Sequence, residues 1–180
     1  MNKNEKHNRA FRVAIYPLIT ILAAACTTGA AAQATQNKTT NTRKMETNQQ
    51  SKDVVGGFFS AFGKGDINGV IESFHDSCTI TAVRPSGRSE SDVYGSYQGK
   101  DGVRSFLSNL GKAFDTKAFS VSHIIGEGAI AFANGSFTHI LRSTGKPYTS
   151  DWALMCVVKD NKILEYHFYE DSGKFAEAQK

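Results

Sequence analysis

The chain has 180 residues and a formal net charge of +4 at pH 7; 40% of its residues are hydrophobic and 21% are charged. This composition is typical of a globular protein and excludes a wholly disordered or collagen-like chain. Residues 1–34 hold four basic residues and one acidic residue, and the remainder holds 17 basic and 16 acidic residues. A nearly neutral domain lacks the basic surface that nucleic-acid binding requires, so we expect no nucleic-acid partner.

Residues 1–34 have the organisation of an export signal. A basic start precedes an apolar run, Val13–Ala25, which is shorter than the roughly 20 residues of a membrane span. The small-x-small sequence Ala32–Ala34 predicts cleavage after Ala34 and a periplasmic or secreted protein. Two alternatives stay open: a lipoprotein box that would tether the protein to a membrane through lipidated Cys26, and an uncleaved anchor.

Residues 35–50 are polar and contain no aromatic side chain, so they cannot bury enough apolar surface to fold alone. We interpret them as a flexible tether between the signal segment and a folded domain over residues 51–180.

Two cysteines, Cys78 and Cys156, fall on separate predicted strands. Export would place them in an oxidising compartment, where pairing is permitted. The alternative is that both are small core residues with free thiols.

Helices are predicted in the first half of the domain. Val54, Phe58 and Phe62 recur at four-residue spacing and indicate one apolar helix face that ends at Gly63–Gly65. Asp66 is expected to cap a second, short helix, and Asp101 a third.

Strands are predicted in most of the remainder. Alternating apolar residues and short turns favour an antiparallel meander, preceded by one strand and a Gly/Ser-rich loop at 84–96 and followed by a short helix from Ser172. The predicted strands are 78–83, 118–125, 129–142, 148–158 and 163–170. Helices packed on such a sheet define an α+β fold.

Four local strings in this order resemble the SnoaL-like branch of the nuclear-transport-factor-2-like superfamily, which includes ketosteroid isomerase, scytalone dehydratase and polyketide cyclases. The strings are Phe58–Asp66, Tyr97–Val103, Thr144–Tyr148 and Asp160–Glu165. The resemblance implies a cone-shaped, curved antiparallel sheet wrapped around about three N-terminal helices, with a pocket for a small apolar molecule.

The resemblance, with period-two alternation, also implies which strand residues face the cone. The inward set is Cys78, Ile80, Ala82, Phe137, His139, Leu141, Trp152, Leu154, Cys156, Tyr166, Phe168 and Glu170.

The usual catalytic groups of these relatives are absent at the matching positions. Phe58 stands where ketosteroid isomerases have a donor tyrosine, Ala82 where they have the base, and Leu154 where they have the donor acid. Phe168 stands at the acid/base aspartate of the polyketide cyclases. We therefore expect neither ketosteroid isomerisation nor polyketide cyclisation by the catalytic groups that these relatives use.

His139 is the candidate acid or base, because an imidazole in the cone could titrate near neutrality. Tyr94 and Asp151 are candidates to orient a substrate. The alternatives are a satisfied core histidine, a packing tyrosine and a hydrated aspartate. The candidate ligand-binding residues are Phe58, Phe137, Trp152, Leu154, Tyr166, Phe168 and Glu170.

No nucleotide-binding glycine motif, phosphate loop or metal-ligand spacing is present, so neither a cofactor nor a metal is expected. If the protein is an enzyme, a cofactor-independent isomerase, lyase or cyclase fits best. The alternatives are a non-catalytic binding module and an interaction module. In the last case an outward apolar stripe at Ala153, Met155 and Val157 would form a homodimer.

Overall fold

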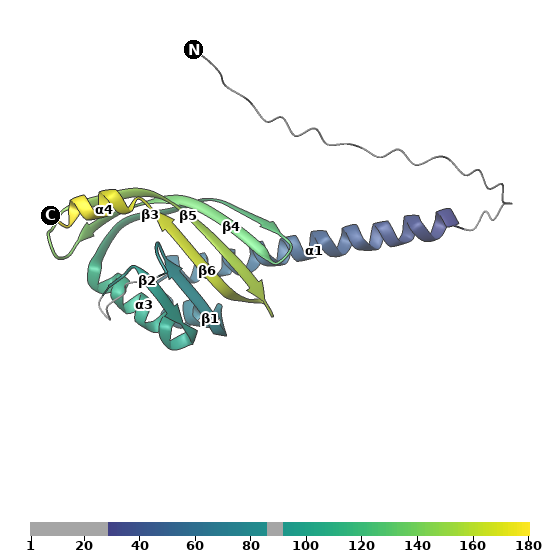
Figure 1. Cartoon of the computed structure of the whole chain (residues 1–180), viewed down its shortest axis with the longest axis horizontal. Helices are drawn as coiled ribbons and strands as arrows, with labels where there is room; N and C mark the ends of the chain where they lie inside the picture. Colours follow the sequence, from purple (N-terminus) through teal and green to yellow (C-terminus); the bar gives the residue numbers. More distant parts are fainter. Residues whose placement is uncertain (1–28, 86–91) are drawn as a thin grey trace, which may run out of the picture.

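The computed structural model describes residues 29–85 and 92–180 (Figure 1). The helices are α1 (Gly29–Gly63), α2 (Ile67–Glu72), α3 (Gly99–Ala113) and α4 (Ser172–Ala178). The strands are β1 (Phe74–Ala82), β2 (Gly95–Gln98), β3 (Phe114–Glu127), β4 (Ile130–Leu141), β5 (Pro147–Lys159) and β6 (Lys162–Glu170). The predicted apolar signal run, Cys26 and part of the predicted Gly/Ser-rich loop lie outside the described residues.

The strands form one sheet in the order β2-β1-β6-β5-β4-β3. Strands β3 to β6 are the predicted antiparallel meander, and the tight β5–β6 turn places Asp160 and Asn161 at positive φ, as a two-residue hairpin turn requires. The sheet is not antiparallel throughout, because β1 runs parallel to β6. The predicted α+β architecture with a curved sheet is confirmed, and Figure 1 shows the long strands arching past α3.

Helix α1 begins well before the expected residue 51. The polar segment 35–50 was expected to be flexible, but it is helical. Three of its threonines donate a hydroxyl hydrogen bond to the backbone carbonyl four residues earlier. Helix propagation is easier than nucleation, so the packed turns around Val55 and Phe58 can extend a helix into a segment with no core of its own. Figure 1 shows this part of α1 projecting away from the sheet.

The helix starts follow local backbone chemistry. Gly65, at φ +68°, turns the chain after α1, and Asp66 caps α2 as predicted, accepting a hydrogen bond from the Gly69 N–H at 2.9 Å. Asp101 does not cap α3, because the helix already begins at Gly99, whose φ of +63° allows the chain to turn directly out of β2. Asp101 instead lies in the first turn, where the helix dipole favours a negative charge.

Strand boundaries deviate from the predictions where polar residues dominate. The edge strand β2 occupies the end of the predicted loop, β1 begins at Phe74 and β3 begins at Phe114. Much of β3 is exposed at the sheet edge and two register shifts interrupt its pairing with β4, so its apolar alternation is weak in sequence.

The alternation of the central strands is confirmed. Every second residue of β5 from Tyr148 to Val158 is buried, and the expected inward residues of β1 and β4 are buried as well. The inward face therefore turns toward the helices and defines where a site can form.

Candidate functional site

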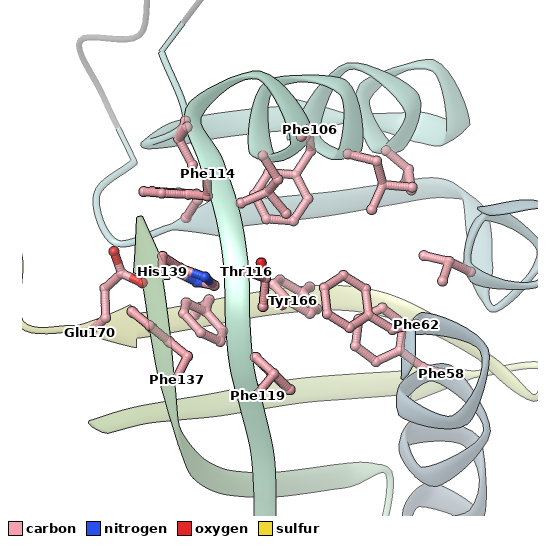
Figure 2. A pocket seen from close by; sticks show the side chains of 18 of the residues that line it. Phe58, Phe62, Phe106, Phe114, Thr116, Phe119, Phe137, His139, Tyr166 and Glu170 are labelled. Carbon is pink, nitrogen blue, oxygen red and sulfur yellow. The ribbon is translucent and has the colours of Figure 1, made fainter. Parts of the chain in front are cut away.

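The inward face of the sheet and the helices enclose a cavity of about 250 Å³. Its walls come from α1, α2, α3, β1, β3, β4, β6 and the segment before β2. Most lining side chains are apolar; those with a polar group are Tyr94, Thr116, His139, Tyr166 and Glu170. Figure 2 shows His139 and Glu170 toward one end of the cavity, and Phe58 and Phe62 toward the other.

Contacting aromatic rings form the apolar end. Phe58 meets the rings of Phe74 and Tyr166 edge-on, each at a centroid distance of 5.7 Å, and Phe62 lies 5.4 Å from Phe119. Edge-on and offset ring pairs of this kind stabilise a wall beyond the burial of their area. This end of the cavity is therefore suited to a planar apolar group.

His139 lies in a sandwich of aromatic rings. Its imidazole stacks on Phe137 at 4.2 Å and on Phe114 at 4.8 Å, and the residue is only 9% exposed. Its Nδ1 atom is buried without a hydrogen-bond partner. Burial lowers the pKa of His139 from 6.5 to about 4, so the ring is neutral at pH 7.

A partly buried carboxyl, with two buried phenols beside it, is the second polar group of the cavity. The Tyr94 hydroxyl donates a hydrogen bond to Oε1 of Glu170. Burial raises the pKa of the Glu170 carboxyl above its usual value, although the hydrogen bond from Tyr94 and the nearby Tyr148 hydroxyl act in the opposite direction. Burial also raises the pKa of both phenols, so they remain protonated donors.

Most of the residues predicted for the site line this one cavity. They are Phe58, Tyr94, Phe137, His139, Tyr166, Phe168 and Glu170. The structure thus brings together residues from the first helix, the segment before β2, and two strands; their roles stay predictions.

Three predicted site residues do not line the cavity. Asp151 is exposed on the outward face of β5, because it alternates with the inward Trp152. Trp152 is inward but covered by Phe119 and Phe168, whose rings stack on it at 5.2 and 5.5 Å. Leu154 is 1% exposed and belongs to the solid core.

The sequence interpretation did not assign several lining residues to the site. Phe106, Leu107 and Leu110 belong to the apolar face of α3, whose periodicity indicated burial but not a cavity. Thr116 was missed because β3 was expected to begin later. It lies opposite His139 of the neighbouring strand β4.

Cys78 and Cys156 are both buried and free, so the structure contains no bond between them. Within residues 29–85 and 92–180, no group of three or more His, Cys, Asp or Glu residues is arranged to hold a metal ion. The described helices include none with both the length and the apolar character needed to cross a membrane.

The fold is similar to that of solved nuclear-transport-factor-2-like structures. An NTF2-like protein from Burkholderia xenovorans LB400 superposes with a TM-score of 0.64 at 19% identity, covering 74% of this chain and 98% of that one. TerC, co-crystallised with polyporic acid, superposes with a TM-score of 0.62 at 18% identity, covering 72% and 98%. These similarities establish a shared fold.

The chain belongs to the SnoaL-like domain family, whose model matches residues 55–166. Patulin biosynthesis cluster protein F of Penicillium expansum is 30% identical over 98 residues, which are 54% of this chain and 47% of that protein. The chain thus spans about half the length of this relative. The predicted SnoaL-like membership is confirmed.

Protonation of His139 should couple stability to pH. The pKa of His139 is lowered from 6.5 to about 4 on folding, so the unfolded chain binds a proton more readily between these values. The histidine's contribution to stability is complete above pH 6.5 and falls by about 2–3 kcal/mol as the pH drops to 4. Urea denaturation of the wild type and His139→Gln between pH 4 and 7 measures this contribution as a difference.

The variant comparison is needed because Glu170, with a raised pKa, contributes in the opposite sense. His123→Gln is the matched control, since His123 is exposed on β3. We expect His123→Gln to keep the wild-type pH dependence and His139→Gln to lose the His139 component. Identical pH dependence in all three proteins would contradict the buried neutral histidine.

Proposed function

We propose that the cavity binds a small planar molecule that is largely apolar and carries one hydrogen-bonding group. The observation that carries this proposal is the aromatic cavity with the neutral imidazole of His139 in its wall. A polar group placed in an apolar pocket orients a ligand by forming a hydrogen bond with it.

The cavity volume limits the ligand. An apolar cavity of about 150 Å³ is enough for benzene. The roughly 250 Å³ found here therefore suits one substituted ring or two fused rings. Such a ligand would place its apolar part against Phe58 and Phe62 and its polar group near His139.

The relatives support the same substrate class. TerC was co-crystallised with polyporic acid, and another relative is a patulin biosynthesis cluster protein. On this basis we propose cofactor-free chemistry of the isomerase, dehydratase or cyclase kind, with non-catalytic binding as the alternative. The polar groups on the cavity wall supply donors and acceptors for either role.

We further propose that the domain acts outside the cytoplasm. The apolar run Val13–Ala25 and the cleavage sequence Ala32–Ala34 support export, and Cys26 offers a lipid anchor instead.

A second candidate role is assembly through the outward face of the sheet. Ile125, Phe132 and Met155 are neighbours across β3, β4 and β5, and the first two are 63% and 49% exposed. Tyr169 on β6, beside Ala153, is 49% exposed as well. An apolar area of this kind on a face exposed to water is typical of a surface covered by a partner. We propose that a second copy of the chain covers it.

Ligand binding can be tested with 2-naphthol and naphthalene, which differ only in a hydroxyl. We expect the wild type to bind 2-naphthol about fivefold more tightly, the ratio for a net hydrogen bond of about 1 kcal/mol. His139→Phe should bind both compounds with equal affinity, because it keeps the aromatic stack and lacks the acceptor. Isothermal titration calorimetry measures both affinities.

His123→Phe is the control for this comparison, because it makes the same substitution at an exposed position. Failure of the wild type to bind either compound would contradict the proposed site. An unchanged preference for 2-naphthol in His139→Phe would contradict the role of His139.

Dimer formation can be tested by placing a charge on the outward face. Phe132→Lys should convert a dimer to a monomer in multi-angle light scattering, because a lysine in a covered apolar surface loses its hydration. Ser108→Lys, exposed on α3, should leave the mass unchanged. A wild-type protein that is monomeric at all concentrations would contradict this second role.

A further inference from the structure

Glu170 is a carboxyl group in an apolar cavity, and within residues 29–85 and 92–180 no cation forms an ion pair with it. It ends β6, lines the cavity and is paired in register with Trp152. Burying a carboxyl without a cation destabilises a protein, so such a group is a candidate for function rather than for structural stabilisation.

Aromatic hydroxyls rather than charges accompany this carboxyl. Tyr94 donates its hydroxyl hydrogen bond to Oε1 of Glu170. The Tyr94 ring in turn packs on Phe175 of α4 at 4.7 Å, and Phe175 lies 5.7 Å from Phe114, one of the two rings that stack on His139. A continuous aromatic layer thus connects the carboxyl to His139 at the same end of the cavity.

The backbone next to Glu170 is fixed from the neighbouring strand. The Asp171 N–H donates to Oγ of Ser150 at 2.9 Å, and the Tyr148 hydroxyl donates to the Asp171 carbonyl at 3.1 Å. The Asp171 side chain then caps α4 by accepting hydrogen bonds from Gly173 and Lys174, each at 3.1 Å. These contacts hold the end of β6 in place, as a group that must meet a substrate in one geometry requires.

Other charged side chains in the described part of the chain lie near this end of the cavity, but none of them forms an ion pair with Glu170. Arg84 lies 6.0 Å from the centre of the Tyr94 ring, and Lys174 is 3.8 Å from the exposed Asp171 carboxylate. His139, on β4, is neutral because burial lowers its pKa to about 4. Burial raises the pKa of Glu170 instead, toward the pH at which a general base is most effective.

We propose that Glu170 is the acid–base catalyst of this cavity and that Tyr94 is its positioning residue. This inference rests on the small-molecule site proposed above. The substrate class is a small, neutral, planar compound with an acidic C–H bond beside a carbonyl or C=N group. The carboxylate takes the proton, the C–H electron pair forms a C=C bond, and the π pair of the C=O or C=N group moves to its oxygen or nitrogen. The carboxyl then returns the proton to another carbon of the conjugated system, the C=O or C=N bond re-forms, and the carboxylate is restored.

The test uses 5-nitrobenzisoxazole, a neutral bicyclic compound whose ring opening needs only a base. The C3–H proton passes to the carboxylate, the C–H electron pair forms the third C–N bond of a nitrile, and the N–O bond breaks to leave a phenolate. The coloured phenolate reports the rate directly. We expect the wild type to open the ring in a reaction that 2-naphthol inhibits competitively, because both compounds occupy the cavity.

The variants separate the candidate bases. Glu170→Gln should lower kcat/KM by about 100-fold or more, the usual contribution of a positioned base. Glu177→Gln, which removes the same charge from an exposed position on α4, should keep the wild-type rate. Tyr94→Phe should move the midpoint of the pH–rate profile to higher pH, because the lost hydrogen bond stabilises the charged form of Glu170.

Calorimetry with 2-naphthol distinguishes the two proposals. If Glu170→Gln binds 2-naphthol and still opens 5-nitrobenzisoxazole at the wild-type rate, Glu170 is not the base and the small-molecule site stands. The same conclusion follows if His139→Gln abolishes this reaction and Glu170→Gln does not. If the wild type binds 2-naphthol but does not open 5-nitrobenzisoxazole, the assignment of Glu170 as the catalyst is overturned as well. If Glu170→Gln does not fold, the Tyr94→Phe variant decides: an unchanged midpoint of its pH–rate profile overturns the assignment of Glu170. A wild type that does not bind 2-naphthol overturns both proposals.

Discussion

Aromatic side chains from helices and strands exclude water from the inward side of the sheet, and the chemistry of the cavity depends on this exclusion. Phe114 and Phe137 cover both faces of the His139 ring. The same low-polarity environment moves the pKa of His139 down and that of Glu170 up. One physical cause, desolvation, therefore makes the histidine a neutral hydrogen-bonding group and the carboxyl a better base.

The arrangement of the strands determines which polar groups share this environment. Because β1 pairs parallel to β6, the two strands end side by side, and Tyr94 lies within hydrogen-bond distance of Glu170 at the end of β6. Helix α4 follows β6 immediately and adds Phe175 to the aromatic layer. The polar end of the cavity is thus built by segments that are distant in sequence, whereas its apolar end is built largely by neighbouring turns of α1 and α3.

Periodicity in the sequence was sufficient to predict the α+β class and the meander. Together with the register of the family that the sequence resembles, it also predicted the inward alternation that places Phe137 and His139 on one face. It could not separate cavity wall from solid core: Trp152 and Leu154 face inward like Phe168, but only Phe168 lines the cavity. That distinction depends on which rings stack across the interior. Asp151 was expected near the cavity because it is next to Trp152 in the sequence. Successive side chains of a strand point to opposite faces, so Asp151 lies on the outward face of β5. The Tyr94–Glu170 contact, between residues 76 positions apart, has no local pattern.

The central claim is that the interior is hollow and has one polar end. A crystal structure of the protein with 6-bromo-2-naphthol, analysed by bromine anomalous scattering, tests it most directly. We expect the bromine peak toward Phe58 and Phe62, and the hydroxyl oxygen within hydrogen-bond distance of an imidazole nitrogen of His139. An interior filled by side chains, without a bromine peak inside it, would contradict the claim.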